Sequence, residues 1–82
     1  MLKLYAADYC PYCWKVRDAF KELEIEFEMI PSDPGTPGRE ELLKLGGKGQ
    51  IPFLVDEQRG VQMYESDDII AYGKEHYGSK SD

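Results

Sequence analysis

The pattern of hydrophobic and polar positions predicts alternating strands and helices. Residues 2–6 alternate and then become apolar throughout, which is typical of a short strand entering a sheet. Apolar residues then recur at helical spacing, at Cys13, Val16, Phe20 and Leu23. This stripe predicts an amphipathic helix of about three turns. Cys10 stands at its N-cap and Pro11 at its first position, where the missing N–H costs nothing.

The middle of the chain predicts a second strand and a short helix. Residues 25–30 alternate with period two, and Pro34-Gly35 suits the centre of a type II turn. Thr36 followed by Pro37 is typical of a helix start, and Gly46-Gly47 of a helix end. We expect the apolar side of this helix to be formed by Leu42, Leu43 and Leu45.

The last third predicts a hairpin followed by a helix. Residues 51–55 and 61–64 flank a five-residue polar loop, 56–60, that ends in glycine. Ser66 is suited to cap a final helix whose first turn holds two aspartates. The fold class is therefore α/β, with the order βαβαββα and a mixed four-stranded sheet flanked by helices. We expect one domain over residues 1–78 and a disordered tail over residues 79–82.

Charge and composition exclude several classes of partner. The 82 residues carry a net charge of −6, with a pI near 4.7, and lack the basic surface that nucleic acids or anionic lipids require. No apolar run is long enough to span a bilayer, and the first residues lack a signal peptide's apolar stretch. These features predict a monomeric, cytoplasmic protein with no nucleic-acid or membrane partner.

The two cysteines, Cys10 and Cys13, indicate redox chemistry. The positive end of a helix dipole favours the Cys10 thiolate, whereas Cys13 falls on the apolar stripe and is expected to be buried. Cys10 is thus the predicted nucleophile and Cys13 the resolving thiol, with no tightly bound cofactor. A closed zinc site needs about four ligands, and beyond the two thiols the chain offers only His76 and carboxylates. An iron–sulfur cluster shared by two chains and a pair of inert cysteines remain alternatives.

The segment Leu4-Tyr5 followed by Cys10-Pro11-Tyr12-Cys13 resembles the active site of the glutaredoxins, which have the thioredoxin fold. Gly49-Gln50-Ile51-Pro52 is similar to the family's loop that carries a cis-proline. The segment from Glu65 to Ile69 stands where the family binds the γ-glutamyl end of glutathione, and its Glu-Ser pair is closer to glutathione transferase N-terminal domains.

The resemblance implies a glutathione site made by Tyr12, Ile51, Pro52, Glu65, Ser66 and Asp67. Simpler interpretations are an edge strand beginning at Ile51-Pro52 and ordinary helix capping at Ser66. The family often has lysine three residues before its first cysteine, where this chain has Ala7. Glutathione is an anion, so another cation is needed, and Lys15, Arg39 and Lys48 are the candidates.

The resulting prediction is a glutathione-dependent thiol–disulfide oxidoreductase that reduces protein disulfides and glutathione mixed disulfides. Its partners would be glutathione, as co-substrate, and disulfide-containing proteins. Alternatives are a thioredoxin-like electron carrier reduced by a flavoprotein reductase, an iron–sulfur cluster-binding module, and an isolated transferase N-terminal domain.

Overall fold

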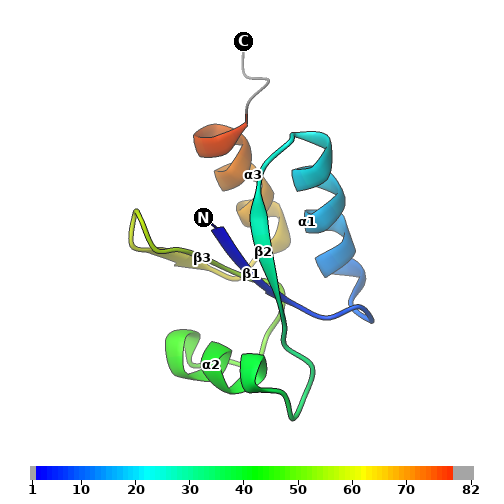
Figure 1. Ribbon diagram of the computed structural model, residues 1–82, viewed down its shortest axis with the longest axis vertical. Coiled ribbons are helices and arrows are strands. Elements are labelled where there is room, and N and C mark those ends of the chain that lie inside the picture. The colour runs from blue at the N-terminus through cyan, green and yellow to red at the C-terminus, as the bar shows by residue number, and fades with distance from the viewer. Residues whose placement is uncertain (1, 79–82) are drawn as a thin grey trace.

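The computed structural model describes residues 2–78, which form a four-stranded sheet with helices on both faces (Figure 1). The elements in chain order are β1 (Leu2–Ala6), α1 (Pro11–Glu22), β2 (Phe27–Pro31), α2 (Pro37–Gly46), β3 (Phe53–Asp56), β4 (Val61–Met63) and α3 (Ser66–Tyr77). The sheet order is β2-β1-β3-β4, with β1 and β2 parallel and the other pairs antiparallel. The predicted mixed sheet is confirmed. The predicted tail, 79–82, lies outside the described residues.

The central strands separate two apolar layers. Figure 1 shows α1 and α3 side by side on one face of the sheet and α2 on the other. The first layer contains Leu2, Leu4, Ala6, Cys13, Val16, Phe20, Ile25, Leu54 and Ile69, and the second contains Tyr5, Leu42, Phe53 and Val55. Alternation along β1 explains this division, because successive side chains of a strand point to opposite faces. Within residues 2–78, no helix is long and apolar enough to cross a membrane.

The helix ends largely follow the predicted signals. Thr36 caps α2, accepting a hydrogen bond on its hydroxyl from the Arg39 backbone N–H at 3.2 Å. Gly47 ends the helix with a φ of 82°, a left-handed conformation that glycine adopts without strain. The predicted turn before α2 is also present: Gly35 has a φ of 90°, and the Thr36 N–H donates to the Asp33 carbonyl.

The predicted start of the second strand is wrong, because β2 begins at Phe27 and not at Ile25. The Ile25 N–H donates to the carbonyl of Phe20 at 2.8 Å, at the end of α1. This N–H is therefore not available for a hydrogen bond to β1. The Ile25 side chain is 5% exposed and packs in the core.

The predicted apolar side of α2 is also wrong in part. Gly38 and Leu42 are buried, whereas Leu43 and Leu45 are 44% and 40% exposed. Positions three or four residues apart share a face of a helix, so Leu43 points away from the face that holds Gly38 and Leu42, whereas Leu45 is on that face but lies in the last turn of α2. A Cβ at Gly38 would lie 2.0 Å from the Pro31 carbonyl oxygen. Glycine therefore permits α2 to approach the end of β2.

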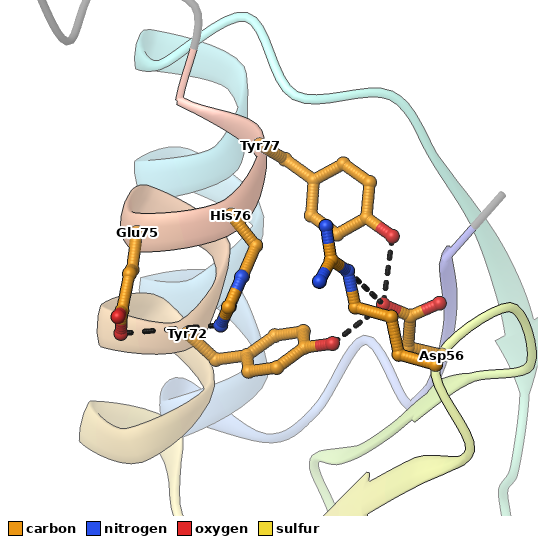
Figure 2. A network of polar contacts seen from close by, with 6 residues as sticks. Asp56, Tyr72, Glu75, His76 and Tyr77 are labelled. Carbon is orange, nitrogen blue, oxygen red and sulfur yellow. Dashed lines mark hydrogen bonds and ion pairs between the residues drawn. The ribbon is translucent and has the colours of Figure 1, made fainter.

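Asp56 was expected in the polar loop of the hairpin, but it ends β3 and is completely buried. Its Oδ2 accepts hydrogen bonds from the hydroxyls of Tyr72 at 2.6 Å and Tyr77 at 2.7 Å (Figure 2). Arg59 Nε lies 3.7 Å from the same oxygen. Burial raises the pKa of Asp56, but the hydrogen bonds from the two tyrosines outweigh it and hold the pKa below its usual value. This carboxylate ties α3 to the hairpin.

Candidate functional site

Cys10 is the N-cap of α1, as predicted, and its side chain is half-buried. Its carbonyl accepts hydrogen bonds from the backbone N–H groups of Cys13 and Trp14, at 3.1 and 3.3 Å. The first turn of α1 contains no acidic residue. The positive end of the helix dipole at Cys10 is therefore not opposed by a carboxylate of that turn.

Cys13 lies one turn further along and is completely buried, as its place on the apolar stripe predicted. Burial raises the pKa of the Cys13 thiol to about 12; the adjacent Cys10 side chain also raises it, while a backbone hydrogen bond from Ala7 lowers it. The two sulfurs thus differ in access, and the raised pKa of Cys13 opposes its ionisation, so Cys10 is the one suited to attack.

The peptide bond between Ile51 and Pro52 is cis, as the resemblance implied. It precedes β3, which lies between β1 and β4, so the alternative of an edge strand beginning at Ile51 is wrong. The Sγ atom of Cys10 lies 4.0 Å from the carbonyl oxygen of Ile51. The fold therefore brings together two loops that are 41 residues apart in the sequence.

A cleft of about 420 Å³ begins beside this contact and runs to the start of α3. Its lining comprises Tyr12, Lys15, Gln50, Ile51, Pro52, Tyr64, Glu65, Ser66 and Asp67. All six residues that the resemblance implied for glutathione are in this set. Of the two predicted catalytic residues, Cys10 lies next to the cleft through Ile51, while Cys13 is buried behind it.

The N-terminus of α3 forms one end of the cleft. The prediction that Ser66 caps this helix is wrong: Glu65 is the N-cap, Ser66 is the first helical residue, and no side chain makes a capping hydrogen bond. Glu65 has an extended backbone, and its carbonyl accepts from the Ile69 N–H at 2.8 Å. The Ser66 hydroxyl is consequently not committed to capping. Asp67 and Asp68 lie in the first turn.

Of the three candidate cations, Lys15 is the one that lines the cleft. Its Nζ lies 2.6 Å from Asp67 Oδ1, and these side chains are 52% and 80% exposed. An exposed pair of this kind is worth about 0–1 kcal/mol, so a charged ligand can exchange with it. Lys48 Nζ lies 5.4 Å from the ring centroid of Tyr64, and the Arg39 guanidinium contacts three other loops.

Two residues of the cleft, Gln50 and Tyr64, were not predicted as site residues. The Tyr64 hydroxyl donates to the Lys48 carbonyl and accepts from the Lys48 N–H, both at 3.1 Å. Their places directly beside Ile51 and Glu65 were the signal available in the sequence. Tyr9, which directly precedes Cys10, does not line the cleft and is 61% exposed.

Trp14 lies outside the cleft, where its indole N–H donates to the Asp8 carbonyl at 2.6 Å and Arg17 stacks on its ring. Trp14 and Arg17 border a larger hollow, of about 690 Å³, between α1 and the start of β2. Neither cysteine contacts that hollow, whereas the Cys10 sulfur lies 4.0 Å from the carbonyl oxygen of Ile51, a residue that lines the smaller cleft, which is therefore the candidate site. No group of three or more histidine, cysteine or acidic residues within 2–78 is placed to hold a metal ion.

Glutaredoxins and glutathione transferases are among the known proteins that resemble this chain in sequence and fold. Glutaredoxin 2 of Escherichia coli strain K12 is 39% identical over 75 residues, which cover 87% of this chain and 32% of that protein. A crystal structure of glutaredoxin 2 from Salmonella typhimurium in complex with glutathione aligns with a TM-score of 0.75 and 28% identity, over 88% of this chain and 32% of that one. The predicted resemblance to glutaredoxins and the thioredoxin fold are confirmed.

A diazinon-metabolizing glutathione S-transferase of the silkworm Bombyx mori aligns with a TM-score of 0.79 and 34% identity, over 94% of this chain and 38% of that one. The chain thus spans about a third of the length of these relatives. Residues 4–81 match the family described as glutathione S-transferase, N-terminal domain. Because this match covers most of the sequence, the chain belongs to the family of glutathione S-transferase N-terminal domains.

Proposed function

We propose that the protein is a glutathione-dependent thiol–disulfide oxidoreductase in which Cys10 is the nucleophile. The observation that carries this proposal is the place of Cys10: half-buried at the start of α1, with its sulfur 4.0 Å from the carbonyl that precedes cis-Pro52. A substrate sulfur held along Ile51 would lie next to the attacking sulfur. The glutathione complex of the Salmonella glutaredoxin 2 supports the choice of ligand.

The first step is exchange with a glutathione mixed disulfide. The Cys10 thiolate attacks the glutathione sulfur, a Cys10–glutathione disulfide forms, and the protein substrate leaves as a thiolate that takes a proton from water. A second glutathione thiolate then attacks the bound glutathione sulfur, which releases glutathione disulfide and regenerates the Cys10 thiolate. The net reaction consumes one free glutathione for each mixed disulfide and yields the protein thiol and glutathione disulfide.

Cys13 provides the second route, which protein disulfides require. After Cys10 has formed a mixed disulfide with a protein, the Cys13 thiolate attacks the Cys10 sulfur and displaces the reduced protein, leaving a Cys10–Cys13 disulfide. The raised pKa of Cys13 makes this thiolate scarce at neutral pH. We therefore expect glutathione to compete with Cys13 for the mixed disulfide.

The cleft supplies groups for both ends of glutathione. The Ser66 hydroxyl and the N-terminus of α3 suit the γ-glutamyl carboxylate, and Asp67 or Glu65 suits its ammonium group. Lys15 is the cation for a glutathione carboxylate, because it lines the cleft and its exposed pairing with Asp67, at the γ-glutamyl end, can be exchanged. The backbone of Ile51 suits the central cysteinyl residue, in the manner of an added strand.

Mass spectrometry of the protein after incubation with glutathione disulfide tests the proposal. The Cys13→Ser variant should gain one glutathione on Cys10, while Cys10→Ser should gain none at Cys13 because that sulfur is buried. The wild type should turn over a glutathionylated peptide in the presence of glutathione. Absence of a Cys10 adduct in both the wild type and Cys13→Ser would contradict the proposal.

A second candidate is glutathione conjugation, which the family match favours. It requires that glutathione bind as a free thiolate and attack an electrophile. An aromatic chloride electrophile such as 1-chloro-2,4-dinitrobenzene separates the two functions, since conjugation would persist in Cys13→Ser and would form no disulfide on Cys10.

A further inference from the structure

Arg39, on the first turn of α2, connects three loops around the cysteine site. Its Nε donates to the Ser32 carbonyl at 2.8 Å, its Nη1 donates to the Gly49 carbonyl at 2.8 Å, and its Nη2 donates to the Tyr9 hydroxyl at 3.4 Å. Ser32 follows β2, Gly49 precedes the cis-proline by three residues, and Tyr9 directly precedes Cys10. One half-buried side chain therefore contacts both loops of the active site.

The geometry of these contacts favours a structural use of the charge over ligand binding. A guanidinium is planar and presents five donors in a fixed arrangement, which suits simultaneous contacts to separate backbone carbonyls. Each of the three nitrogens of Arg39 already donates to a group of this chain. Arg39 also does not line the cleft, unlike Lys15.

The loop before the cis-proline is held from both sides. Arg39 binds the Gly49 carbonyl, while the Tyr64 hydroxyl binds the N–H and the carbonyl of Lys48. A Cβ at Gly49 would lie 2.8 Å from Arg39 Nη1, so the guanidinium fills the space that a side chain there would take. Residues 48–50 lie outside helix and strand, so these contacts, and not the hydrogen bonds of a β-sheet, fix the position of Ile51.

We propose that Arg39 is a positioning residue that sets the separation between Cys10 and the Ile51 carbonyl by holding the Tyr9 and Gly49 loops together. The inference rests on the proposed function of the cleft. In-line attack on a disulfide needs the reacting atoms at about 3–3.5 Å, and a displacement of 1 Å costs on the order of 100-fold in rate. Loss of Arg39 therefore lowers turnover and leaves the Cys10 sulfur itself intact.

The test uses Arg39→Ala, Arg39→Lys, Gly49→Ala and the exposed control Lys44→Ala on the same helix. Each variant is assayed for kcat and KM with a glutathionylated peptide and glutathione, and for the rate of Cys10 alkylation by iodoacetamide. Arg39→Ala should lower kcat/KM by about tenfold or more, which is within the range expected for misplaced reacting atoms, and the loss should include a lower kcat. Alkylation of Cys10 should change less than twofold, and Lys44→Ala should match the wild type.

Gly49→Ala separates positioning from charge. It alters no charge, yet its Cβ displaces the guanidinium, so it should lower kcat in the same direction as Arg39→Ala. The double variant should be no worse than the worse single variant, because both act through one contact. Arg39→Lys should recover only part of the activity, since an ammonium cannot reach all three loops.

Three results would overturn the inference and leave the proposed function standing. The first is a folded Arg39→Ala variant with the turnover of an active wild type. The second is an effect on KM alone that Arg39→Lys restores and Gly49→Ala does not reproduce, and the third is additive losses of activity in the Arg39→Ala/Gly49→Ala double variant. A wild type without turnover overturns the proposed function instead. Gly49→Ala keeps the test valid if Arg39→Ala fails to fold.

Discussion

Tyr72→Phe removes one of the two hydroxyl groups that donate to the buried Asp56 carboxylate (Figure 2). A hydrogen bond to a charged group contributes about 1.5–3 kcal/mol to stability, more than a bond between neutral groups. The carboxylate has no exposed surface, so water cannot replace the lost donor. We expect the variant to lose about 1.5–3 kcal/mol at pH 7, or of order 10 °C in Tm for a domain of this size.

The same contact gives stability a defined dependence on pH. Asp56 has a lowered pKa in the folded protein, below the value of about 3.9 that aspartate has in an unfolded chain. Its stabilisation is therefore fully present above about pH 4 and is lost as the pH falls through the folded pKa. In Tyr72→Phe the pKa of Asp56 is lowered less. The stability difference from the wild type should be full at pH 7 and shrink below about pH 4.

Urea denaturation followed by the fluorescence of the single tryptophan measures these differences at pH 7 and in steps down to pH 2.5. Tyr12→Phe is the matched control for stability, because that ring is 62% exposed and loses a hydroxyl in water. It should stay within about 0.5 kcal/mol of the wild type. A Tyr72→Phe variant as stable as Tyr12→Phe, or a difference that grows in acid, would refute the role assigned to Asp56.

Three further changes have equally direct readouts. Iodoacetamide at pH 8 should modify Cys10 alone in the folded wild type and both cysteines in urea, because burial raises the pKa of Cys13 to about 12; two adducts on the folded protein would contradict this. Gly73→Ala should destabilise by about 1–3 kcal/mol in thermal melts, because its Cβ would lie 2.6 Å from the Phe20 ring; a rise in Tm would mean that the ring moves freely. Lys15→Gln should raise the KM for glutathione severalfold relative to Lys21→Gln, whereas a lower KM would show that Lys15 blocks Asp67.

Local signals predicted most elements of this fold. The stripe through Cys13, Val16 and Phe20, the Thr36-Pro37 start and the Gly46-Gly47 end each depend on neighbours within a few residues, and each is present. The place of Cys13 on that stripe likewise predicted that it is more buried than Cys10. Such features are readable because helix caps and periodicity are decided by the adjacent chain.

The errors arise where distant segments decide the outcome. Asp56 has the composition of a hairpin loop, but hydroxyls from α3, 16 and 21 residues away, make its burial possible. Leu43 and Leu45 are as apolar as Leu42, and the way α2 packs against β1 and β2 determines which of them is covered. Neither relation is visible in a short window of sequence.

The choice of a cation for the site also depends on distant segments, and the fold distinguishes the three candidates. Lys15, Arg39 and Lys48 were equivalent in the sequence, since each carries one positive charge near a predicted motif. In the fold, Arg39 lies against the Gly49, Ser32 and Tyr9 loops, and Lys48 lies over the Tyr64 ring. The charge that remains toward the cleft is Lys15, whose exposed partner, Asp67, can pair with the ligand's ammonium group instead. Under the proposed function, the acidic chain binds anionic glutathione through Lys15, while Arg39 fixes the loops next to Cys10 and Ile51.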